Sequence, residues 1–263
     1  MSSLKEKKLF LLDMDGTIYF EDQLIPGAKE FLNAVLTKNS KYIFLTNNSS
    51  KGSDQYLEKL KSMQIVANES NIFTSGMATA IYILNNKLPR EAYVVGTNSF
   101  KDQLKSYGIE VMDDHHNANL LIVGFDTELT YHKIVNACEL IARNVLYIAT
   151  NPDLTCPVSE GRYIPDCGAI CNMLEAATNR TPIYMGKPKK EMVDFLSKRE
   201  MVDLQDIVII GDRLYTDIAC GINAGITSVA VLTGETKAND IVNSQFKPDF
   251  VFNSLFDLCY EIQ

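Results

Sequence analysis

The stretch that most restricts the fold is a run of four apolar residues, 9–12, that stops abruptly at Asp13-Met14-Asp15-Gly16-Thr17. A short apolar run bounded by turn residues is typical of a strand that is buried on both faces of a parallel sheet. Such sheets bind ligands at the carboxyl ends of their strands. Asp13 and Asp15 both leave the alternation of the strand there, because Gly16 lets the backbone turn sharply. One carboxylate could attack a substrate and the other could transfer protons, although a plain strand end with an Asp-Gly turn would have the same letters.

Apolar strand-like runs alternate with amphipathic helical patterns along the rest of the chain, which predicts an α/β fold. We expect one doubly wound, parallel, Rossmann-like sheet to contain the runs 9–12, 41–45, 71–74, 182–185, 206–210, 228–232 and 249–252.

A second set of runs, at 92–96, 120–124 and 145–149, can form a smaller α/β unit of its own. We therefore predict a core that consists of residues 1–85 and 181–263, with an inserted α/β domain at 86–180. Residues 151–167 contain three prolines and are expected to form a long loop, of the kind that is often functional.

Composition excludes several classes of protein. A formal net charge of -8 with scattered lysines argues against a nucleic-acid partner. No apolar run approaches the roughly 20 residues that span a bilayer, and the polar start does not resemble a signal peptide, so we expect a cytoplasmic protein without a membrane partner. The six cysteines are expected to be free thiols. The run Asp113-Asp114-His115-His116 contains residue types that can bind metals, but a solvated loop is the favoured interpretation.

Four polar clusters share one placement, because each follows a predicted strand: Asp13 and Asp15; Thr46, Asn47 and Asn48; Lys187; and Asp212 and Asp217. The carboxyl ends of parallel strands lie along one edge, so these clusters can converge on a single crevice. Crowded carboxylates repel one another unless a cation lies among them, and oxygen ligands without His or Cys favour Mg2+.

Such a site suits a phosphoryl group. Lys187 and the donors of Thr46 and Asn47 can bind phosphoryl oxygens, Asp13 can attack phosphorus, and Asp15 can protonate the leaving oxygen and later deprotonate water. Two alternatives stay open at this point. Lys187 could be a solvated surface lysine, and Asp217 could cap a helix or support the site instead of binding metal.

With these motifs in this order, the chain resembles the haloacid dehalogenase (HAD) superfamily of phosphohydrolases, in its NagD-like class IIA branch. The resemblance implies a HAD-like core with the insertion as a cap. It implies that Asp13 is the nucleophile and Asp15 the acid/base, and that Mg2+ is held by Asp13, Asp212 and the main-chain carbonyl of Asp15. It also implies that the phosphoryl group is bound by Thr46, Asn47 and Lys187, with Asn48 beside them. Asp153 and Cys156 of the cap become candidates for substrate choice.

The predicted function is therefore a magnesium-dependent phosphatase that hydrolyses a small phosphorylated metabolite, such as a nucleoside monophosphate or a sugar phosphate, through an aspartyl-phosphate. The alternatives are a phosphomutase or another phosphoryl-transfer enzyme on the same scaffold, and a phosphate-binding regulatory protein without turnover. A dehalogenase is disfavoured because it would not need an acid/base at Asp15. The sequence carries no signal for an oligomeric state.

Overall fold

The computed structural model of the protein describes residues 3–158 and 161–263, which divide into two compact units. The first unit consists of the chain up to Thr46, of Leu57–Phe73 and of Lys187–Gln263, and the second consists of Asn47–Tyr56 and Thr74–Gly186. The second unit is larger than the insertion 86–180 expected from the sequence, because residues 47–56, 74–85 and 181–186 pack with it. The functional division into a core and a cap stays a prediction.

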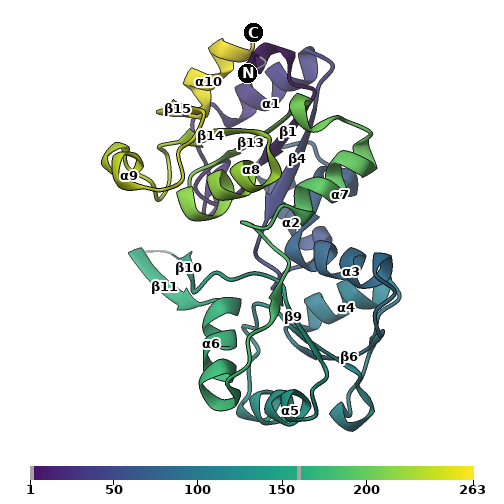
Figure 1. Cartoon of the computed structure of the whole chain (residues 1–263). Helices are drawn as coiled ribbons and strands as arrows, with labels where there is room; N and C mark the ends of the chain where they lie inside the picture. Colours follow the sequence, from purple (N-terminus) through teal and green to yellow (C-terminus); the bar gives the residue numbers. More distant parts are fainter. Residues whose placement is uncertain (1–2, 159–160) are drawn as a thin grey trace. The chain divides into compact units, whose positions relative to one another are not determined.

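A six-stranded sheet forms the centre of the first unit (Figure 1). Its spatial order is β15 (Phe250–Phe252), β14 (Thr227–Val231), β13 (Ile207–Gly211), β1 (Leu9–Leu12), β4 (Lys41–Thr46) and β5 (Ile72–Thr74). All four residues of β1 are fully buried, as an apolar run in a central parallel strand requires. Leu12 pairs with Ile210 on one side and with Phe44 on the other, so the chain leaves all three strands at the same edge.

Helices cover both faces of this sheet. They are α1 (Ala28–Thr37), α2 (Ser53–Ser62, which begins in the second unit), α7 (Glu191–Glu200), α8 (Ala219–Ala224), α9 (Ala238–Asn243) and α10 (Leu255–Ile262). The connections β1-α1-β4 and β13-α8-β14 run in opposite directions along the sheet, so right-handed crossovers place α1 and α8 on opposite faces. The strand order therefore reverses beside β1, where doubly wound sheets bind their ligands. A small hairpin, β2 (Tyr19–Phe20) and β3 (Gln23–Leu24), follows β1.

The second unit has its own parallel sheet, whose order is β12 (Ile183–Tyr184), β9 (Leu146–Ala149), β8 (Leu120–Val123), β6 (Glu91–Val95) and β7 (Glu110–Val111). Alternate residues of its strands belong to two apolar clusters. Tyr93 and Val95 pack with α5 (Tyr131–Ala142) and α6 (Cys167–Thr178), whereas Ala92 and Val94 pack with α3 (Ser75–Asn85) and α4 (Asn98–Ser106). The period of two with both faces apolar explains why these runs lack polar residues.

Two expectations about secondary structure are wrong, and two helices were not expected. The run 182–185 does not join the large sheet, because β12 pairs with β9 at the edge of the second sheet. Residues 151–167 are not simply a loop, since Thr155–Val158 (β10) and Arg162–Pro165 (β11) form an antiparallel ribbon. The terminal helices α9 and α10 were not predicted. Within residues 3–158 and 161–263, every helix is too short or too polar to cross a bilayer.

Candidate active site

Lys187 lies at the centre of a buried ion-pair network in the first unit. Its Nζ lies 2.5 Å from Oδ1 of Asp13 and 2.6 Å from Oδ1 of Asp217, and it donates to the carbonyl of Leu45 at 3.2 Å. Only 3% of the lysine side chain is exposed, which rules out a solvated surface lysine. Asp13 directly follows β1, where its N–H donates to the carbonyl of Ile210. Segments that are far apart in the sequence therefore supply one charge cluster.

The charges of this cluster shift the pKa values of its members. Burial opposes the charge of Lys187, but the carboxylates of Asp13 and Asp217 raise its pKa above the ordinary lysine value. Burial and repulsion by Asp217 raise the pKa of Asp13, against the attraction of Lys187. Burial and the same repulsion raise the pKa of Asp212 to about 6. A further cation at this edge of the sheet would relieve the repulsion.

Asp212, which directly follows β13, lies against two glycines. A Cβ on Gly16 would come within 2.5 Å of Oδ2 of Asp212, and a Cβ on Gly234 would overlap the same oxygen. Gly16 also has a φ of +87°, which L residues with side chains rarely adopt. The Oδ2 atom accepts a hydrogen bond from the N–H of Glu235 at 2.7 Å.

The other oxygen of Asp212, Oδ1, is buried and has no hydrogen-bond partner among the described residues. Asp212, Asp13 and Asp217 each offer one carboxylate oxygen, and these atoms lie within 4.8 Å of one another. An unpartnered carboxylate oxygen among other carboxylates fits a hard divalent cation such as Mg2+.

Asp217, which lies in the π-helical turn Leu214–Ile218 after β13, has both oxygens engaged within the protein. Oδ1 contacts Lys187, and Oδ2 accepts from the N–H of Arg213 at 3.2 Å and from Oγ1 of Thr216 at 3.4 Å. Of the two interpretations left open by the sequence, these contacts favour a supporting position over direct metal binding.

Asp15 and Thr46 also lie at this edge of the first unit. Asp15 lies in the tight turn that follows β1, where Gly16 donates its N–H to the carbonyl of Tyr19. Its carboxylate is not part of the three-aspartate group. Thr46 is the last residue of β4, which pairs with β1, and it is buried.

The remaining predicted residues belong to the second unit. Asn47 donates its side-chain amide to Oδ2 of Asp153 at 3.0 Å. Asn48 Oδ1 accepts hydrogen bonds from the N–H and the hydroxyl of Ser50, which holds the local turn. Cys156, in β10, is half-buried against the apolar cluster that contains α5 and α6. The structure therefore gives Asn48 a local hydrogen-bonding role and Cys156 a local packing role.

Two residues of the first unit were missed by sequence reasoning. Arg213 is largely buried, and its Nε lies 3.1 Å from Oε2 of Glu235. Burial opposes its charge, but Asp13 and Asp212 raise the pKa of Arg213. Glu235 belongs to the polar stretch Thr233-Gly234-Glu235 just beyond β14, so the strand-end rule applied to a fifth strand would have found it.

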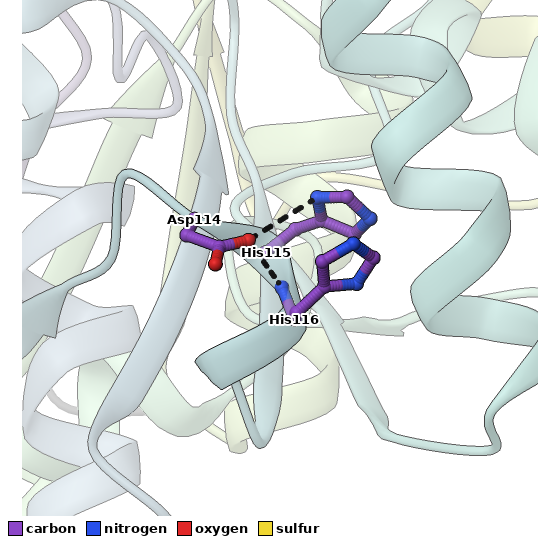
Figure 2. Close-up of side chains that lie close together, drawn as sticks. All are labelled: Asp114, His115 and His116. Atoms are coloured by element: carbon purple, nitrogen blue, oxygen red, sulfur yellow. Dashed lines mark hydrogen bonds and ion pairs between the residues drawn. The ribbon is translucent and has the colours of Figure 1, made fainter.

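A second group of side chains of metal-binding types, Asp114, His115 and His116, lies in the second unit at the start of the 3-10 turn His115–Asn117 (Figure 2). Oδ1 of Asp114 accepts a hydrogen bond from the N–H of His116 and so caps the turn. His115 is buried, and its Nε2 lies 2.6 Å from Oε2 of Glu139 in α5. The expectation of a solvated loop is therefore wrong for His115, whose ring anchors the turn to a helix.

Comparison with known proteins places the chain in a family. Residues 10–110 match the family described as haloacid dehalogenase-like hydrolase, and residues 184–258 match a second one described as HAD-hydrolase-like. The chain is 32% identical to an acid sugar phosphatase of Staphylococcus haemolyticus, covering 96% of this chain and 95% of that protein. It is also 32% identical to the 5'-nucleotidase YutF of Bacillus subtilis, covering 96% and 97%.

Solved structures agree over nearly the full length. The 4-nitrophenylphosphatase of Thermotoga maritima matches with a TM-score of 0.95 at 40% identity and covers 100% of both chains. NagD of E. coli matches with a TM-score of 0.88 at 29% identity, covering 95% of this chain and 98% of that one. The parallel core sheet, the site residues in their order and these relatives lead to one conclusion: the chain belongs to the haloacid dehalogenase-like hydrolases, in the NagD-like class IIA branch.

Proposed function

We propose that this protein is a magnesium-dependent phosphatase that hydrolyses small phosphomonoesters through an aspartyl-phosphate intermediate. The observation that carries the proposal is the buried network in which Lys187 contacts Asp13 while an oxygen of Asp212 lies close by without a donor. A carboxylate, an ammonium group and a cation-binding oxygen at one strand edge are the groups that phosphoryl transfer requires.

Asp13 and Asp212 would hold Mg2+ together with the main-chain carbonyl of Asp15. The bound ion would offset the negative charge of the phosphoryl oxygens and of the two carboxylates. The unpartnered Oδ1 of Asp212 supports this assignment, because a buried carboxylate oxygen is otherwise costly.

In the first step, an oxygen of Asp13 attacks phosphorus and forms a P–O bond, while the bond from phosphorus to the leaving oxygen breaks. Among the described residues, Lys187 is the hydrogen-bond donor to the Asp13 carboxylate and contacts Oδ1, so we assign the attack to Oδ2. Asp15, in its protonated form, donates its proton to the leaving oxygen, and the alcohol departs. Lys187 and the donors of Thr46 and Asn47 stabilise the charge on the phosphoryl oxygens.

In the second step, Asp15 is a carboxylate and accepts a proton from a water molecule that attacks phosphorus. The bond between phosphorus and Asp13 breaks, which regenerates the Asp13 carboxylate and releases inorganic phosphate. Asp217 takes no part in bond making. Its contact with Lys187 keeps the ammonium group beside Asp13.

The proposed substrates are small phosphorylated metabolites, and we infer that the protein acts on them in the cytoplasm. Two of the relatives described above are an acid sugar phosphatase and a 5'-nucleotidase. Sugar phosphates and nucleoside monophosphates are therefore the first candidates.

A phosphate-release screen over several dozen monoesters, with Mg2+ and with EDTA, tests the proposal. We expect Mg2+-dependent release from at least one group of monoesters and none from Asp13→Asn. Transfer of phosphate between positions of one substrate, without net release, would instead identify a mutase. Binding of phosphate without any turnover would identify a regulatory protein and refute the proposal.

A further inference from the structure

We propose that Asp153, Asn151 and Ser75 are positioning residues, which hold Asn47 in the orientation that binds the phosphoryl group. This inference rests on the proposed function, because Asn47 is a phosphoryl-binding residue only in that context. It assigns to Asp153 a role other than the choice of substrate that the sequence suggests.

The polar groups of Asn47 are held from three directions within the second unit. Its side-chain Nδ2 donates to Oδ2 of Asp153 at 3.0 Å. Its carbonyl oxygen accepts from Nδ2 of Asn151 at 2.8 Å and from Oγ of Ser75, the first residue of α3, at 2.6 Å. Both the peptide plane and the side chain of Asn47 are therefore fixed, which is what a preorganised donor requires.

The residues that hold Asn47 are themselves fixed by further contacts. Oδ1 of Asn151 accepts from the N–H of Asp153 at 2.9 Å, so the Asn151 side chain fixes the backbone of Asp153 in an Asx turn just beyond β9. A Cβ on Gly186 would lie 2.5 Å from Oδ1 of Asn47, which shows how closely the backbone approaches this side chain. Little room is left for the amide of Asn47 to rotate.

Burial makes these contacts strong. Asn47, Ser75 and Asn151 are all buried, and Asp153 is 8% exposed. A donor that loses its partner in such surroundings cannot turn to water instead, so removal of one acceptor disturbs the whole group. Because Oδ2 of Asp153 accepts from Asn47, we expect its removal to act on the binding of the phosphoryl oxygens, which all monoesters share.

The test compares inorganic phosphate, which has no leaving group, with a series of monoesters. In Asp153→Ala we expect the Ki of inorganic phosphate as a competitive inhibitor to rise about 10- to 100-fold, by analogy with the loss of affinity at metal sites when a residue that orients a ligand is removed. The ratios of kcat/KM between monoesters should stay within about twofold of wild type, since they cancel any effect on the shared phosphoryl group.

Two variants serve as controls. Asp153→Asn keeps an oxygen that can accept from Asn47, so it should restore most of the affinity for phosphate. Asn136→Ala removes a buried amide that donates to the hydroxyl of Tyr93 at 2.9 Å in the same unit. It should lower stability without changing the Ki of phosphate.

The outcomes separate the two proposals. Active wild-type protein in which Asp153→Ala leaves the Ki of phosphate unchanged but alters the ratios between monoesters would overturn the positioning role alone, and would make Asp153 a specificity residue. Wild-type protein that neither hydrolyses a monoester nor binds phosphate would remove the proposed function, and the positioning role with it.

Discussion

Replacement of Asp212 by Asn should remove a pH-dependent penalty from the metal-free protein. The pKa of Asp212 is raised from 3.8 to about 6 in the folded chain. Between these values the folded state binds more protons than the unfolded state, so the free energy of unfolding falls as pH rises and the loss is complete above about pH 6. One pKa unit corresponds to about 1.4 kcal/mol, so the interval amounts to about 3 kcal/mol.

Urea unfolding in EDTA, followed by circular dichroism at several values between pH 4 and pH 7.5, measures this penalty. The substitution changes only the first unit, so the difference between the two proteins cancels the contribution of the second. We expect the free energy of unfolding of Asp212→Asn, relative to wild type, to rise by about 2.4 kcal/mol from pH 4 to pH 7, because at pH 4 the unfolded carboxyl is already more than half ionised.

The second part of the experiment repeats the unfolding measurement with added Mg2+. A ligand at 100 times its dissociation constant stabilises the folded state by about 2.7 kcal/mol, so wild type should recover most of the loss at pH 7 while Asp212→Asn should not respond. A difference between the two proteins that stays constant across the pH range would refute the argument from burial and repulsion. An equal Mg2+ response of both proteins would refute Asp212 as a metal ligand.

The other predictions concern neighbouring residues. Asp13→Asn should lower phosphate release by about 10³-fold or more with an unchanged circular dichroism spectrum, because the amide cannot attack phosphorus. Lys187→Met leaves two buried carboxylates unpaired and should lower the free energy of unfolding by about 3–5 kcal/mol, measured by urea unfolding at pH 7. Gly234→Ala forces Asp212 to move and should cost about 1–3 kcal/mol, while calorimetric titration should record weaker binding of Mg2+. EDTA should abolish phosphate release, and Mg2+ should restore it; release that persists in EDTA would contradict the metal assignment.

The parts of the fold that local pattern determines were predictable. The run Leu9–Leu12 is apolar throughout because both faces of β1 are covered, and this signal placed Asp13 at the correct edge. The convergence of Asp13, Lys187 and Asp212 followed from the same rule, although Lys187 follows a strand of the other sheet. Two residues, Ile183 and Tyr184, are too few to indicate which sheet edge they join.

The features of the site that were not predicted from the sequence depend on contacts between distant residues, which no local sequence pattern contains. Glu235 holds Asp212 with its backbone N–H, a group that every residue except proline carries. The bond between Asn47 and Asp153 joins residues 106 positions apart. His115 is buried where its ring lies edge-on to Tyr93 and pairs with Glu139 of α5, contacts that the exposed character of its sequence neighbours concealed.

The close packing around Asp212 determines which substitutions the neighbouring positions tolerate. At position 235 the backbone N–H donates to Asp212, so a saturation library should accept many side chains there, with proline as the clear exception. One residue earlier, at Gly234, even a methyl group has no room, and Gly16 is restricted both by space and by its backbone angle. Although positions 234 and 235 are adjacent, they should therefore differ sharply in the variety of side chains that they permit.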